Sequence, residues 1–178
     1  LTFYMFTLPV WQLAAGWLTT VAVVICGMSV VFAFLGGGSR LLEGRRSNDD
    51  AKLLRPILFA FAGLLTALAI RVYIGRFDRL FVDHTIFSGV TYTDAHVTIT
   101  GLALVAAALV VGALAAVAGG ATSPSVRWLV IAVAPAALAY AGVGVVGWYV
   151  NSFLVRPNQL ARERPYIAHN IEMTRRAY

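Results

Sequence analysis

Four long apolar stretches dominate the chain, and short polar segments separate them. Residues 1–39 carry no charged side chain, and three more stretches of membrane length follow. A bilayer core is crossed by about 20 consecutive apolar residues in a helix, and backbone groups in lipid must be hydrogen-bonded within helices or closed barrels. The pattern therefore predicts an all-α, polytopic transmembrane helical bundle with four spans, at about residues 9–35, 53–70, 97–119 and 128–150.

Helical periodicity continues beyond the second span. Tyr73, Phe77 and Phe81 recur every four residues and would form one stripe on a helix. Arg79 and Asp83 have the spacing of a pair on another face. Residues from Arg71 to about Phe81 are therefore expected to form an amphipathic helical extension along the membrane interface.

The third apolar stretch consists almost wholly of small and aliphatic residues. Ala108, Gly112, Ala116 and Gly120 recur every four residues, and such a ridge allows helix backbones to approach closely in lipid. The ridge is expected to pack against another helix. Two alternatives are open: a contact inside this chain, or a contact between subunits of an oligomer.

The chain changes character after residue 150. Residues 151–178 are polar and basic, in contrast to the transmembrane region 1–150. Asn158 is expected to cap a short helix, and Pro165 to open a second one. Residues 151–178 are interpreted as the start of an extracytoplasmic domain.

Composition supports a membrane protein and argues against a nucleic-acid-binding one. The chain is 60% hydrophobic and 12% charged, with a net charge of +6, whereas globular proteins are about one quarter charged. The positive charges lie in loops, where anionic lipids are the expected counterpart. Membrane lipids, and either further subunits of a membrane assembly or a second copy of the chain, are the expected partners; nucleic acid is not.

The short loops indicate the orientation in the membrane. Four spans place both chain ends and residues 71–96 on one side, with loops 36–52 and 119–127 on the other. Lys and Arg in short loops weigh most in orientation. We therefore expect loops 36–52 and 119–127 in the cytoplasm of a multi-pass plasma-membrane protein, with loop 71–96 and the C-terminal tail outside the cytoplasm.

The loop before the third span holds the candidate chemistry. Asp83 with His84, and Asp94 with His96, could bring oxygen and nitrogen donors together for zinc or a similar divalent ion. The alternative is a loop tied by hydrogen bonds, in which Asp94 and His96 cap the third span. The alternative is preferred, so no metal, cofactor or catalytic residue is expected.

The same loop is expected to contact the tail, because the topology places both on one side. The loop offers Asp78, Asp83 and Asp94 as acceptors, with Asp94 preferred. The tail offers Arg156, Arg162, Arg164 and Arg175 as donors. Arginine binds a carboxylate through two parallel hydrogen bonds. Tyr92 and Tyr166 would pack beside such a pair.

Three segments resemble a bacterial family that carries only an uncharacterised-protein-family label. The resemblance implies a large integral membrane protein with about seven spans and a large extracytoplasmic domain, of which this chain would be the last four spans and the start of that domain. It supports the same orientation as the short loops and implies no activity. The first two matching segments are Phe3-Tyr4-x-Phe6-Thr7-Leu8-Pro9 and Tyr92-Thr93-Asp94-x-His96. The third, in the tail, is Arg156-Pro157-Asn158-x-Leu160 followed by Glu163-Arg164-Pro165-Tyr166-Ile167-x-x-Asn170-Ile171-x-x-Thr174-Arg175-x-x-Tyr178.

Two functional classes are preferred on these features, and a metal-dependent enzyme is a third alternative. The first is a non-enzymatic protein of the bacterial cell envelope that anchors or scaffolds a large extracytoplasmic domain, which handles lipid or another apolar ligand. The second is a transporter whose coupling residues lie in spans outside this chain. The apolar cores of the four spans carry no Asp, Glu, Lys, Arg or His, and ion pathways need such residues facing a cavity. The first class is therefore preferred.

Overall fold

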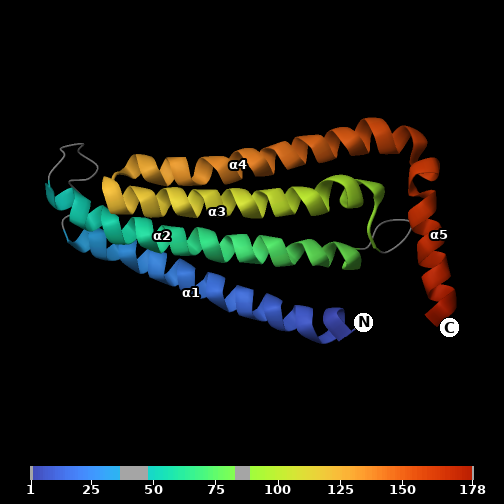
Figure 1. The fold of residues 1–178 in the computed structure, drawn as a ribbon, viewed down its shortest axis with the longest axis horizontal. Helices are drawn as coiled ribbons and strands as arrows, with labels where there is room; N and C mark the ends of the chain where they lie inside the picture. Colours follow the sequence, from blue (N-terminus) through green and yellow to red (C-terminus); the bar gives the residue numbers. More distant parts are fainter. Residues whose placement is uncertain (1, 37–47, 83–88, 178) are drawn as a thin grey trace.

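The computed structural model describes residues 2–36, 48–82 and 89–177, and every element in these ranges is helical. Four long helices pack side by side, and a fifth lies across one end (Figure 1). The all-α class with four spans is confirmed. The long helices are α1 (Leu8–Leu35), α2 (Asn48–Gly75), α3 (Ile99–Thr122), α4 (Val126–Tyr149) and α5 (Gln159–Ala177); short π or 3₁₀ turns flank them at η1 (Phe3–Thr7), η3 (Arg76–Phe81), η4 (Asp94–Thr98), η5 (Val150–Val155) and η6 (Arg156–Asn158).

The four membrane helices are longer than the hydrocarbon core of a bilayer. With their flanking turns they cover Phe3–Leu35, Ala51–Phe81, Asp94–Thr122 and Val126–Asn158. The shortest of them would measure about 44 Å at 1.5 Å per residue, against a core of about 30 Å. Each is therefore long enough to cross the hydrocarbon core with helical turns to spare. The expected helical extension of the second span reaches Phe81, as the sequence predicted.

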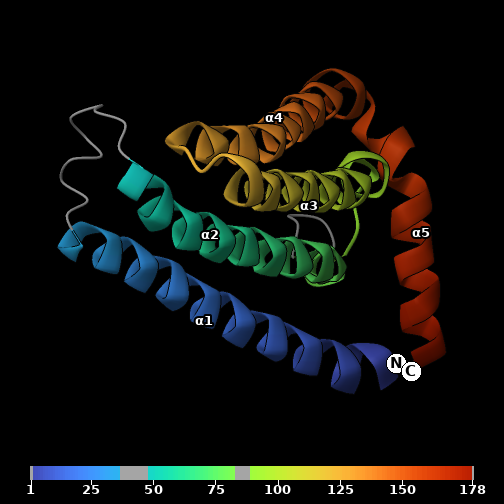
Figure 2. The same ribbon diagram turned by 60° about the vertical axis from the view of Figure 1, so that its left-hand side comes forward.

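The helices pack in chain order, each against the next, with α3 between α2 and α4. The start of α1, the end of α2, the start of α3 and α5 lie at one end, which we call the α5 end, and the α3–α4 turn lies at the other (Figure 1). The four long helices therefore alternate in direction along the chain. Figure 1 shows α1 diverging from α2, and α4 from α3, toward the α5 end, and Figure 2 shows the divergence of α4 from α3 from a second side.

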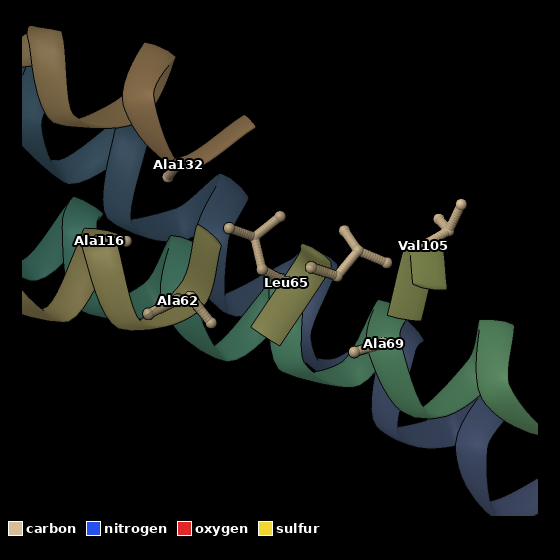
Figure 3. Packing of buried hydrophobic residues seen from close by; sticks show 8 residues of the cluster. Ala62, Leu65, Ala69, Val105, Ala116 and Ala132 are labelled. Carbon is tan, nitrogen blue, oxygen red and sulfur yellow. The ribbon is translucent and has the colours of Figure 1, made fainter. Parts of the chain in front are cut away.

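The core consists of small and aliphatic side chains on α2, α3 and α4. Leu65 of α2, Val105 of α3 and Ala132 of α4 belong to one buried cluster, together with five further alanine and leucine side chains (Figure 3). Helices α1 and α4 instead expose most of their large apolar side chains, as expected where lipid is the solvent. The cluster therefore makes α3 the central helix.

The small-residue ridge packs inside this chain. A Cβ atom added at Gly112 would lie 2.1 Å from the carbonyl oxygen of Ala132, and one added at Gly120 would lie 3.4 Å from the ring of Phe59. Glycine is required at Gly112 because the α4 backbone occupies the space of a side chain. Of the two alternatives for the ridge, the intrachain contact is the one observed at these positions.

The expected break in the tail was wrong. Asn158 is the last residue of η6, and α5 continues through Pro165 without interruption. Proline removes one backbone donor and leaves the carbonyl four residues earlier without its usual partner. Here that carbonyl belongs to Ala161, and both residues are exposed, so water can satisfy it. A single helix therefore replaces the two that were expected.

Candidate functional site

The start of the third span receives a carboxylate from the tail. Glu163 of α5 is 4% exposed, and its two carboxylate oxygens accept the backbone N–H of Tyr92 at 3.1 and 3.2 Å. Helical geometry begins at Tyr92, and the first amides of a helix have no partner within it. An anion is favoured there because the helix dipole places partial positive charge at this end. Glu163 therefore caps the third span from a different helix.

Thr91 and Asp94 complete the helix start. The hydroxyl of Thr91 donates to Oδ2 of Asp94 at 2.9 Å and accepts the backbone N–H of Asp94 at 3.2 Å. The carbonyl of Thr91 accepts the N–H of Ala95 at 3.0 Å. This is the arrangement of a helix cap and an acidic residue three positions later. Asp94, 7% exposed, thus belongs to the cap, as its preferred interpretation required.

The ring of Tyr92 joins the helix start to the tail. The imidazole of His96 stacks on it with centroids 4.2 Å apart, and Nδ1 of His96 lies 3.0 Å from the carbonyl oxygen of Tyr92. The guanidinium carbon of Arg162 lies 5.3 Å from the ring centroid, and Nη1 donates to the Tyr92 hydroxyl at 3.4 Å. Arginine over an aromatic face is favourable. Loop and tail are therefore in contact through Tyr92.

We call Thr91, Tyr92, Asp94, Arg162 and Glu163 the α3–α5 junction. Tyr166 lies half-buried in α5, one helical turn after Glu163. Burial, and then the charges of Glu163 and Tyr92, raise the pKa of the Tyr166 phenol above its usual 10.0. The phenol therefore stays neutral throughout the physiological pH range.

The opposite end of α3 has a complementary cap. Nε of Arg55 on α2 donates to the carbonyl oxygen of Gly120 at 3.0 Å. The last carbonyls of a helix lack partners and carry partial negative charge. The third span, whose helix begins at Tyr92 and ends at Thr122, is therefore held by a carboxylate at its first turn and a guanidinium at its last. Both groups come from neighbouring helices.

A cavity of about 660 Å³ opens beside the junction. Its apolar wall comes from α3 and α4, including Val105 and Val143, and its polar rim carries Arg79 and Arg156. Asp94 and Glu163 also line it. The cavity therefore lies between α3 and α4 at the α5 end.

The sequence-predicted residues separate into three groups. Tyr92, Asp94 and His96 lie together at the helix start, whereas Arg156 lines the cavity and Arg164 is exposed. Asp83 and His84 lie outside the described residues. Among the residues that are described, no group of three or more His, Cys, Asp or Glu side chains could hold a metal ion.

The expected loop–tail contact exists, but its chemistry differs from the prediction. The tail contributes the carboxylate of Glu163, whose acceptor role sequence reasoning missed because it considered only arginine donors. Pairing of Asp94 with Arg156 or Arg164 stays a prediction. The Thr91-x-x-Asp94 pattern before an apolar run is a helix-start signal that could have identified the cap, whereas no local pattern identifies Glu163 as its partner.

Comparison with known proteins assigns the chain to a family. The model of an uncharacterised protein family, UPF0182, matches residues 1–178. A UPF0182 protein of Synechocystis is 33% identical over all of this chain, which covers 19% of that relative. One of Cupriavidus necator is 37% identical over 99% of this chain, again covering 19% of the relative. The chain thus spans about a fifth of these relatives, and no solved structure matches it. The chain belongs to the UPF0182 family.

Proposed function

We propose that this chain is a non-enzymatic membrane anchor of the bacterial cell envelope, which holds the polypeptide that follows α5 in a fixed orientation over the membrane helices. The observation that carries the proposal is the buried hydrogen bond between Glu163 and the backbone of Tyr92. Burying a carboxylate is unfavourable unless it is hydrogen-bonded. The hydrogen bond to Tyr92 therefore favours the docked position of α5.

The position of α5 supports this role. Helix α5 crosses the end of the four-helix bundle and does not continue in the direction of α4 (Figure 1). Its charged side chains include Arg175 and Arg176 in the last turn. In the proposed orientation the α5 end lies outside the cytoplasm, at the plasma membrane. The domain that follows would scaffold an assembly or handle an apolar ligand, with membrane lipids and further subunits as partners.

The test measures how firmly α5 is held. Spin labels on Ala168 of α5 and Ala121 of α3, both exposed, report the distance between tail and bundle in the full protein. Glu163→Ala removes the acceptor and leaves the Tyr92 amide unsatisfied, which costs about 1–3 kcal/mol. The distance distribution is expected to broaden, and less so in Glu163→Gln, which keeps an acceptor oxygen.

A matched control lies on the same helix. Glu172 is exposed and, among the residues that the structure describes, pairs with Arg176 one turn away, so Glu172→Gln is expected to leave the distance distribution unchanged. A distribution in Glu163→Ala as narrow as in the unmodified protein would remove the basis of the anchor proposal.

A further inference from the structure

The cavity beside the α3–α5 junction is lined by arginines, carboxylates and apolar side chains, and a small ion would contact only some of these. Arg79 of η3 and Arg156 of η6 lie on its rim. Within the described part of the chain, neither guanidinium forms a hydrogen bond or ion pair with another side chain. Planar guanidinium groups bind phosphate oxygens through paired hydrogen bonds. The rim is therefore suited to a phosphate group.

Two carboxylates share the same cavity. Asp94 and Glu163 line it and are buried, so the lining carries both signs of charge. A free phosphate beside the arginines would be repelled by these carboxylates. A ligand with a phosphate and an ammonium group would instead satisfy both signs.

The cavity also has an apolar side that extends into the membrane region. Its lining runs from Asp94 to Val105 on the third span, which is about 16 Å along a helix. Leu102 and Val143 contribute to this apolar wall. The polar rim thus lies at the helix ends, and the apolar wall lies at the depth of lipid chains. Water-soluble ligands would leave that wall unused.

We infer that this cavity binds one zwitterionic glycerophospholipid, with its phosphate at Arg79 and Arg156, its ammonium toward Asp94 and Glu163, and an acyl chain along the wall of α3 and α4. Another hollow at the α5 end, about 620 Å³ between α1, α2 and α3, offers a contrast. Its lining, which includes Trp11 and Phe77, is almost entirely apolar. None of the residues that line it is charged.

Gly144 provides a way to fill the cavity without disturbing the backbone. It lines the cavity, and an added Cβ would meet nothing within 4 Å. Gly144→Leu therefore places a side chain in the proposed acyl groove. Gly142 lies on the same helix, also with nothing within 4 Å, and is not among the residues that line the cavity. Gly142→Leu is the matched control.

The experiment is native mass spectrometry of the full protein after delipidation, titrated with three probes. These are phosphatidylethanolamine, phosphatidylglycerol of the same chains, and inorganic phosphate. One phosphatidylethanolamine is expected to bind about tenfold more tightly than phosphatidylglycerol, with no binding of inorganic phosphate. Arg79→Gln, Arg156→Gln and Gly144→Leu should each weaken that binding about tenfold, whereas Gly142→Leu should not.

Any of three other outcomes would overturn the inference that the cavity binds a zwitterionic lipid. Equal or tighter binding of phosphatidylglycerol would show that the carboxylates do not select the headgroup. Binding of inorganic phosphate alone would remove the role of the apolar wall. Unchanged binding in Gly144→Leu, with helical content equal to that of the Gly142→Leu control, would place the lipid elsewhere. These variants leave Glu163 intact, so a result that contradicts the lipid site does not contradict the anchor proposal.

Discussion

The substitution Gly112→Ala tests the close approach of α3 and α4 on which the core depends. The added methyl group would lie 2.1 Å from the Ala132 carbonyl oxygen, a contact that must lengthen to at least 3.0 Å. The obstructing atom belongs to the backbone of α4 and cannot rotate away. One helix must therefore move relative to the other, which also loosens the contacts around Leu65.

The magnitude follows from two opposing effects. Inserting a methyl group into a well-packed core costs about 1–3 kcal/mol. Replacing glycine by alanine inside a helix gains up to about 1 kcal/mol from propensity. Gly63→Ala on α2 has the same propensity gain with no atom within 4 Å of the new Cβ. The difference between the two variants isolates the clash and is expected to be about 2 kcal/mol, with Gly112→Ala the less stable.

The assay is equilibrium unfolding in mixed micelles, followed by the helical circular dichroism signal as denaturing detergent is added. Both variants must be measured in the same detergent, since micelle composition changes the reference state. If Gly112→Ala proves as stable as Gly63→Ala, the backbones of α3 and α4 do not touch at this position, and α3 is not packed as the central helix of the bundle.

Three further predictions concern orientation, the second cap and pH. In a cysteine-free background, Ser123→Cys is expected to be labelled only from the cytoplasm and Ala168→Cys only from outside; external labelling of the former would reverse the orientation. Arg55→Met should lower the free energy of unfolding by about 1–2 kcal/mol, because the Gly120 carbonyl loses its charged donor; an unchanged unfolding midpoint would argue against this cap. The folded pKa of Tyr166 is raised, so its contribution to stability is complete below pH 10 and is lost as pH rises through the folded value; ultraviolet titration should show one late tyrosinate transition that disappears in Tyr166→Phe.

The tail shows where sequence reasoning reached its limit. Its helical character and its position on the same side as the 71–96 loop follow from composition and from counting spans. The sequence suggested that arginines would dock it, because five of them lie in residues 151–178. The structure uses Glu163 instead, since the unpaired group that needed a partner was the amide of Tyr92. That need arises only when the helix start and α5 are brought together.

The helical class, the four spans, the grouping of their ends and the close-packing ridge on the third span all follow from the sequence alone. These features depend on local properties: the length of an apolar run, the charge of short loops and the spacing of small residues. The helix that the ridge faces, the groups that cap α3 and the place where a cavity opens emerge only in the folded bundle. Apolar helices can pack against one another in several arrangements of similar composition. The choice among them depends on contacts between residues far apart in sequence, such as Gly112 with Ala132 and Tyr92 with Glu163, and no local pattern encodes these pairs.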